Sequence, residues 1–309
     1  MKRKVITKLA SLVLTLVILS FLVFALLYIA PGDPAEKRLT SQGIAVTKEV
    51  LDAERERLGL LRPFLVRYGE WLWHILRGDF GISFKDDLPV APKLAKGLKN
   101  TGILALTSLA VSLTGSVLLG AWSAFRQNSA ADYVIRLLSF IGNSLPNFLI
   151  SVLLMYFLCI RMQLFPVIAS GSLQGLFMPV LSLSVPMMGR LTRQMRAEFI
   201  RELEEDYITA MRGRNVRTGF LVRNVMHNTA GHLFTIVALQ IGTLMGGSVV
   251  IETIFRWPGI GKLVMDSINA RDYPVIMGFV MIMGTIYFVL NQLSDMLLPA
   301  LDPRTNSDI

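Results

Sequence analysis

Between two strongly apolar runs, the residues from Arg190 to Gly231 read RLTRQMRAEFIRELEEDYITAMRGRNVRTGFLVRNVMHNTAG. This stretch, which we call the polar elbow, contains eight arginines and five acidic residues. Its first half carries apolar residues at the helical spacings of three and four: Ile200, Leu203, Tyr207, Ile208 and Met211. Gly213, Asn215 and Gly219 then interrupt the pattern, which predicts a helix, a turn and a second helix.

Two interpretations of the polar elbow are open on spacing alone. It is either an ordinary cytoplasmic loop, whose arginines set the orientation of the neighbouring spans, or a docking element for a soluble partner. The second interpretation follows because helix-in-groove recognition uses a spaced apolar stripe with a polar rim. The surrounding sequence has to decide between them.

The composition indicates a protein with several membrane spans. Of the 309 residues, 53% are hydrophobic and 17% are charged, and the mean hydropathy is +0.54. The net charge of +9 does not indicate a nucleic-acid partner, because the basic residues are spread through loops and form no basic and aromatic cluster. The single cysteine, Cys159, has no partner for an intrachain disulfide.

Six apolar runs predict an all-α, polytopic membrane protein with six transmembrane helices. They are Leu9–Ala30, Thr101–Phe125, Val134–Ile160, Leu176–Met188, His232–Phe255 and Val275–Leu298. As a helix the first run covers about 33 Å, which is enough to span a bilayer and too long for the apolar region of a cleaved signal peptide. The fourth contains Pro179 and Pro186, so we expect it inside the bundle. The basic N-terminus and the polar elbow place both termini in the cytoplasm.

The segment after the first span is polar but contains an amphipathic stretch. Tyr68, Trp71, Trp73 and Leu76 lie within it and suit a membrane interface. We therefore expect this stretch to lie against lipid on the outer side of the membrane.

Small residues in the fifth run predict close helix packing. Gly242 and Gly246 form a G-x-x-x-G pair, and Gly247 follows directly. Packing within the subunit and packing against a second subunit are both open. Glu252, near the outer end of the same run, is expected to bond the external turn that follows it.

The sequence contains no motif for catalysis, metal binding or a cofactor. His74, His227 and His232 do not form H-E-x-x-H, so neither a structural nor a catalytic metal is expected. The G-x-G-K run ending at Lys262 lacks the spacing and the hydroxyl residue of a phosphate-binding loop. We therefore predict a chain that is not itself an enzyme.

Several longer motifs together resemble a known family. They are PGDP at 31, GDFGISF at 78, LPNF at 145, EDYITAMRG at 205, GGSVVIETIFRWPGIG at 246, RDYPV at 271 and LDPR at 301. Over nearly its whole length the chain resembles the inner-membrane permease subunits of ABC importers of the dipeptide, oligopeptide and nickel class. YGEWLW followed by GDFGISF is most similar to nickel-type permeases.

The resemblance implies an ABC importer type I permease fold in the bacterial inner membrane. It implies a first span with an extracytoplasmic segment (1–98), a permease domain (99–298) that includes the polar elbow, and a cytoplasmic tail (299–309). The expected partners are a second homologous permease subunit, two ATP-binding cassette subunits and an extracytoplasmic substrate-binding protein. The expected cargo is nickel, a metal chelate or a di- or oligopeptide. The alternative is a membrane-embedded enzyme or signalling protein with a cytoplasmic docking loop.

The resemblance also implies that the polar elbow contains the coupling helix, which sits in a cleft of the ATP-binding subunit. Glu205, Asp206, Tyr207, Ala210 and Gly213 fall in the motif of that helix. On this interpretation the stripe of Leu203, Tyr207 and Met211 is seated in the partner. The sequence departs from the family pattern at Asn215, where a glycine is usual, and at His227-Asn228-Thr229, where Arg-Asn-Ala is usual.

Overall fold

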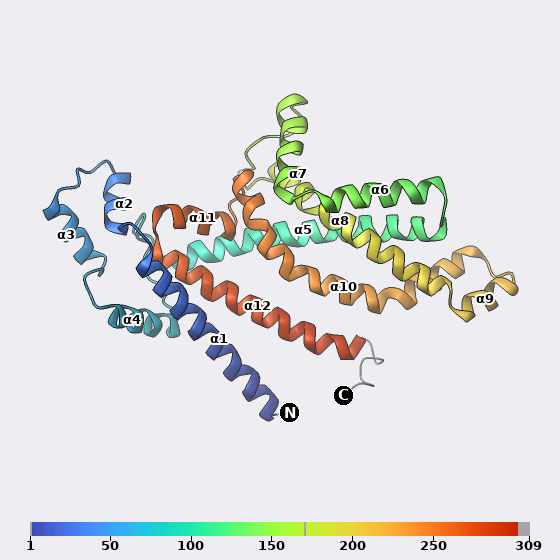
Figure 1. Ribbon diagram of the computed structural model, residues 1–309, viewed down its shortest axis with the longest axis horizontal. Helices are drawn as coiled ribbons and strands as arrows, with labels where there is room; N and C mark the ends of the chain where they lie inside the picture. The colour runs from blue at the N-terminus through green and yellow to red at the C-terminus, as the bar shows by residue number, and fades with distance from the viewer. Residues whose placement is uncertain (1, 170, 302–309) are drawn as a thin grey trace. The chain divides into compact units, whose positions relative to one another are not determined.

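Helices make up the regular structure of the described part of the chain (Figure 1). The computed structural model describes residues 2–169 and 171–301, without the side chains of residues 2–6, 9, 231–239, 241–243, 245 and 293–301. The helices are α1 (Lys2–Ile29), α2 (Pro34–Ser41), α3 (Lys48–Arg57), α4 (Phe64–Leu76), α5 (Val90–Phe125), α6 (Ala130–Ser144), α7 (Asn147–Leu154), the π-helical η1 (Met155–Arg161), α8 (Leu173–Leu203), α9 (Asp206–Gly213), α10 (Thr218–Ile254), α11 (Ile260–Ala270) and α12 (Tyr273–Leu301).

Each of the six expected apolar runs lies in helical structure, but within the described part of the chain fewer than six helices qualify as membrane spans on length and composition. Among the described residues three helices do so, through Ala10–Ile29 of α1, Val90–Phe125 of α5 and Tyr273–Gln292 of α12. A fourth is counted if α6 and the α7–η1 segment form one bent span. The remaining two runs lie in α8 and α10, so the count of six stays a prediction.

The expected third span is not one straight helix. Its two parts, Ala130–Ser144 and Asn147–Arg161, meet at an angle of 104°. Pro146 explains the break, because proline disfavours the helical conformation of the residue before it, and Leu145 is extended with ψ 134°. The break lies in LPNF, one of the motifs that carry the family resemblance.

The chain forms two compact units. The first consists of Met1–Asn100 and Pro258–Val289. In it, three motifs that are far apart in the sequence come together. The buried carboxylate of Asp272 accepts hydrogen bonds from the Ser83 hydroxyl and, at 2.8 Å, from the Phe84 backbone N–H. Gly32 of the PGDP turn has φ 102°, a backbone conformation that favours glycine, and the Arg271 guanidinium packs against it.

The second unit consists of Thr101–Trp257 and Leu290–Ile309. In it α8 packs along both α6 and α10, and Pro179 and Pro186 are buried within α8, as the sequence predicts for this helix. Glu252 is fully buried and accepts a 2.6 Å hydrogen bond from Thr101 of α5. This bond joins α10 to α5 inside the unit.

The expected orientation can be tested with single cysteines, after the buried Cys159 is replaced by serine. Thr218 and Ser41 are both exposed in the structure. We expect the Ser41→Cys variant to react with a membrane-impermeant thiol reagent in intact cells, because Ser41 follows the first span on its outer side. The Thr218→Cys variant should react only after the membrane is permeabilised. Labelling of Thr218→Cys in intact cells would show that the orientation is wrong.

Candidate functional site

The polar elbow contains three helical segments and two tight connections. α8 continues to Leu203, α9 occupies Asp206–Gly213, and α10 begins at Thr218. The turn between α9 and α10 has Asn215 in the left-handed conformation, with φ 55°. Asparagine tolerates that conformation, which accounts for its use where the family usually has glycine. Gly219 does not interrupt a helix as expected, because it lies within α10.

The apolar stripe of the elbow faces the chain's own core. Ile208 of α9 is fully buried in a cluster with Phe199 of α8 and Val225 of α10. Leu203, Tyr207 and Met211 are half-buried and pack against the same cluster. A side chain that packs into the chain's own core cannot also insert into a partner. These residues therefore support α9 from beneath and offer only their outer edges to a partner.

Tyr207 is also held by hydrogen bonds. Its hydroxyl donates to Glu202 Oε1 at 2.5 Å and accepts from Asn228 Nδ2 at 3.0 Å. Desolvation, followed by the bond to the Glu202 carboxylate, raises the pKa of Tyr207 to about 12. The phenol therefore stays neutral at physiological pH and fixes α9 between the end of α8 and the start of α10.

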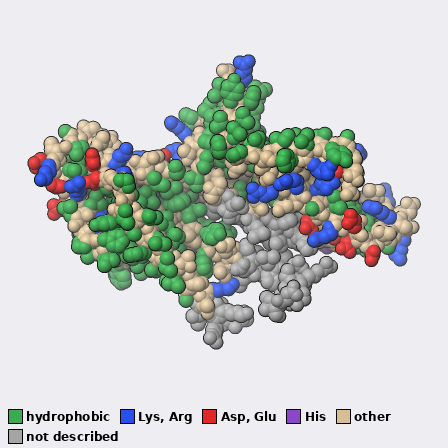
Figure 2. Space-filling view, in the orientation of Figure 1, with side chains coloured by type: hydrophobic (Ala, Val, Ile, Leu, Met, Phe, Trp, Pro, Cys, Tyr) green, Lys and Arg blue, Asp and Glu red, His purple; other side chains and the backbone are tan. Residues whose placement is uncertain are grey.

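The outer face of α9 is exposed, polar and nearly flat. Of the residues predicted from the family motif, Glu205, Asp206, Ala210 and Gly213 lie on it. Thr209, which is not among the predicted residues, is exposed beside them. Charged side chains gather around this end of the unit (Figure 2). Small side chains at positions 209, 210 and 213 leave the backbone of α9 open to close approach by another surface.

A buried ion pair braces the helix that leads into the elbow. Asp132, at the start of α6, is fully buried. Arg196 of α8 binds both of its oxygens, Nε to Oδ1 at 2.8 Å and Nη2 to Oδ2 at 2.8 Å. The Ser123 hydroxyl of α5 and the Asn128 backbone N–H also donate to this carboxylate. Such a bidentate, fully bonded pair fixes three helices at one point.

This ion pair was not predicted from the sequence. Asp132 had a signal, because it follows Ser129 in the pattern of a capped helix start, and the Ser129 hydroxyl does accept a bond from the Asp132 N–H. Arg196 gave no signal of its own among the eight arginines of the elbow.

The glycines of α10 differ in their surroundings. Gly242 lies outside the residues whose side-chain environment is described. Gly246 is exposed, and among the described residues no atom lies within 4 Å of the place of a Cβ there. The Asn147 amide lies 3.6 Å from that place on Gly247. Gly247 therefore packs near α7, while Gly246 leaves an open surface.

A cavity of about 60 Å³ lies beside Gly247. It is lined by residues of α7, α8 and α10, among them Asn147, Pro186, Arg190 and Gln240. Helix-breaking proline and polar groups inside an apolar bundle are typical of a solvated path, although a cavity of this size holds only a water or two.

Comparison with known proteins gives a consistent result along the whole chain. A family model described as "Binding-protein-dependent transport system inner membrane component" matches residues 116–307, and a model of the N-terminal part of such membrane components matches residues 1–105. The chain is 33% identical over 303 residues to the nickel import system permease protein NikB of Staphylococcus aureus, covering 98% of this chain and 91% of that one.

Two further relatives are named for other cargoes. The glutathione transport system permease protein GsiC of Salmonella choleraesuis is 33% identical over 300 residues, covering 97% of each chain. The metal-staphylopine import system permease protein CntB of Staphylococcus aureus is 30% identical over 301 residues, again covering 97% of each.

We predict that Arg196→Met strongly destabilises the second unit, because it leaves a buried carboxylate without its cation. Breaking a buried pair in this way costs about 3–5 kcal/mol. The double variant Asp132→Asn/Arg196→Met should recover most of that loss. Thermal unfolding of the purified protein in detergent measures both.

The matched control is Arg193→Met, because Arg193 is an exposed arginine on the same helix and forms no ion pair with any described residue. It should change the free energy of unfolding by no more than about 0.5 kcal/mol. Equal effects of the Arg193 and Arg196 substitutions would contradict the bracing role.

Proposed function

Because this chain belongs to the family of binding-protein-dependent transport system inner membrane components, we propose that it forms one half of the translocation pathway of an ATP-driven importer. Its relatives are named as permease proteins of import and transport systems, which supports the same role for this chain, and we propose that it is not itself an enzyme. ATP hydrolysis belongs to separate subunits in this proposal. No observation favours the alternative of a membrane-embedded enzyme or a signalling protein.

The orientation of α9 is the observation that carries the proposal. A solvated loop needs neither a buried anchor nor an ion-pair brace, yet α9 has Ile208 fully buried beneath it, and α8 is fixed to α6 by Arg196 and Asp132. A helix held this firmly, with an exposed low-relief outer face, is suited to receive force from a soluble subunit. We therefore interpret α9 as the coupling helix.

In the mechanism we propose, the ATP-binding subunit contacts the outer face of α9 through Asp206, Ala210 and Gly213. When the two ATP-binding subunits close, they displace α9. Because Ile208 and Tyr207 hold α9 to the ends of α8 and α10, the displacement moves these two helices with it. Packed side chains transmit such a shift with little loss, since protein interiors are close-packed.

A second permease subunit is the proposed partner within the membrane. A pathway lined on two sides needs a second bundle, and the open surface at Gly246 permits the close approach of another helix. The proposed domain boundaries are 1–98, 99–298 and 299–309, with both termini in the cytoplasm.

The proposed cargo is nickel, a metal chelate or a di- or oligopeptide, delivered by an extracytoplasmic substrate-binding protein. The names of the relatives support this range, because they include nickel, glutathione and metal-staphylopine. Identifying the ligand bound to the cognate binding protein would narrow the range to one compound.

We predict that Gly213→Trp lowers ATP-driven uptake at least about tenfold, a loss of about 1.4 kcal/mol or more in coupling. Gly213 has no atom within 4 Å of its Cβ position, so the indole would meet the partner and not this chain. Uptake and stimulation of ATPase activity by the loaded binding protein are measured at equal membrane abundance.

Gly219→Trp is the matched control, because Gly219 is equally exposed and also has no atom within 4 Å of its Cβ position, but lies outside α9. It should retain most of the uptake. Normal uptake by Gly213→Trp, at normal abundance, would contradict the assignment of α9.

We predict that Gly246→Leu weakens association with the second permease subunit without unfolding this one. The added side chain has open space within the chain and would separate two closely packed helices. The ratio of the two permeases after affinity purification measures the effect, with Gly219→Leu as the control. An unchanged ratio would place the subunit interface elsewhere.

A further inference from the structure

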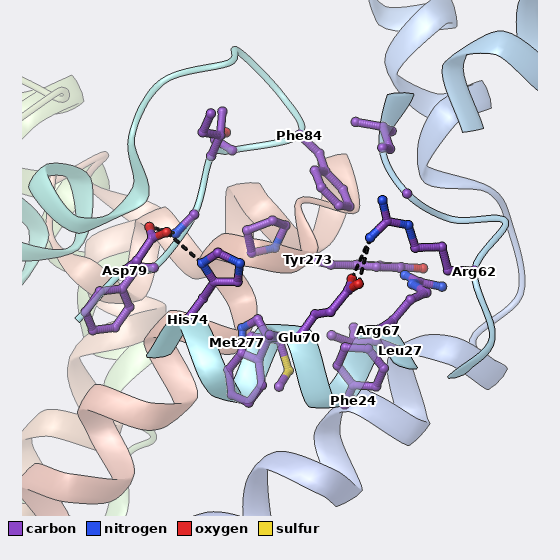
Figure 3. Close-up of a pocket in the computed structure, with 18 of the residues that line it drawn as sticks. Phe24, Leu27, Arg62, Arg67, Glu70, His74, Asp79, Phe84, Tyr273 and Met277 are labelled. Atoms are coloured by element: carbon purple, nitrogen blue, oxygen red, sulfur yellow. Dashed lines mark hydrogen bonds and ion pairs between the residues drawn. The ribbon is translucent and has the colours of Figure 1, made fainter. Parts of the chain in front are cut away.

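The first unit contains a pocket of about 790 Å³ that the transport mechanism does not use (Figure 3). Residues of α1, α4, the 78–84 segment and the start of α12 line it. Phe24, Trp71, Phe84, Tyr273 and Met277 give it a largely apolar and aromatic wall. An apolar pocket with a few polar groups is the usual form of a site for a small organic molecule.

The pocket lies next to α4, a helix whose exposed apolar surface suits contact with lipid. α4 packs on the second half of the α1 span, where Tyr68 reaches Ser20 at 3.0 Å and Phe64 meets Phe21 edge to face. A neighbouring side of α4 exposes Leu65 and Leu76, with 70% and 72% of their surfaces accessible. Figure 2 shows the apolar surface of this part of the first unit. An exposed apolar face beside a membrane span belongs in the bilayer interface.

Most charged side chains of the pocket already have partners. Arg62 donates to both oxygens of Glu70 at 2.8 Å, and His74 lies 3.0 Å from Asp79. Asp87 is bound by Arg38 and Arg57. Glu56, a further acid of the lining, is exposed to solvent.

Arg67 differs from these groups. It is half-buried and forms no ion pair or hydrogen bond through its side chain with any described residue. Its guanidinium lies 5.7 Å from the centre of the Phe24 ring, and it points into the same part of the pocket as Tyr273 (Figure 3). Desolvation lowers the pKa of Arg67 from its usual value, although the group remains charged at neutral pH.

A second donor in the lining also lacks an acceptor. The Nε1 atom of Trp71 is buried and has no hydrogen-bond partner in the described part of the chain. A buried donor without an acceptor is costly, and so is a partly buried cation without an anion. Trp71 Nε1 is closed off from the pocket space, so a ligand in the pocket compensates only Arg67, by bringing acceptor oxygens and a negative charge to its guanidinium.

We propose that this pocket binds a membrane phospholipid, with the phosphate on Arg67 and the glycerol and upper acyl chains along the aromatic wall. A guanidinium is the side chain best suited to a phosphate, because it donates two parallel hydrogen bonds. A soluble anion would satisfy Arg67 but not the apolar wall beside it. The site anchors the extracytoplasmic segment to the outer leaflet, whatever the cargo of the importer.

The test is native mass spectrometry of the complete importer purified in a mild detergent. We expect the wild-type complex to retain phospholipid at this subunit, and Arg67→Gln to lower that occupancy at least about fivefold. Arg67→Lys, which keeps the charge, should retain more than half. Arg77→Gln is the control, because Arg77, the residue directly after α4, lies over the Trp73 ring and does not line the pocket. Equal phospholipid occupancy in wild type and Arg67→Gln would overturn the proposal.

A second measurement does not depend on the folding of any variant. Adding phosphatidylglycerol to delipidated wild-type complex should raise its thermal unfolding temperature, while inorganic phosphate or glycerol phosphate at the same concentration should not. An equal shift from inorganic phosphate would show that the site takes a soluble anion, and no shift from the phospholipid would show that the pocket has no lipid ligand. Either result would overturn the proposal.

Discussion

The contact between Arg196 and Asp132 is the constraint on which the second unit depends. It lies where α8 changes from an apolar helix to the charged helix of the polar elbow. Neither charge is stable there alone, because taking an ion out of water costs several kcal/mol unless a partner compensates. The pair therefore fixes α8 against α5 and α6. It thereby sets the position of the part of α8 that follows Arg196.

The consequence is a rigid support for α9. In an isolated elbow, the arginines and acids would favour solvent and the short helix would be marginal, since eight residues are too few for an independent helix. Burial of Ile208 and the two hydrogen bonds of Tyr207 supply the missing stability. A coupling element has to be stiff in this way, because a soft one would absorb the motion of its partner instead of transmitting it.

The first unit uses the same physical solution, in which hydrogen bonds compensate a buried charged group. Asp272 is buried, and hydrogen bonds from Ser83 and Phe84 replace the water it has lost. Around it, Arg38 joins Glu54 and Asp87, and Arg55 joins Asp33. These contacts hold the polar segment in one arrangement and leave Arg67 without an anionic partner among the described residues, which is why the pocket beside it has a definite chemistry.

The sequence by itself determined the helical class, the six apolar runs, the family and the place of the polar elbow. The helical class, the apolar runs and the polar elbow depend on composition and periodicity, and the family depends on a resemblance in short motifs; all of these are local properties of a chain. Only the tertiary structure decided which way the stripe of Leu203, Tyr207 and Met211 faces, because helical spacing shows that residues share a face but not what covers it. It also decided that the third run bends at Pro146 and that Arg196, among many similar arginines, finds Asp132. Packing between segments determines long-range partners of this kind, and the residue spacing within one segment does not predict that packing.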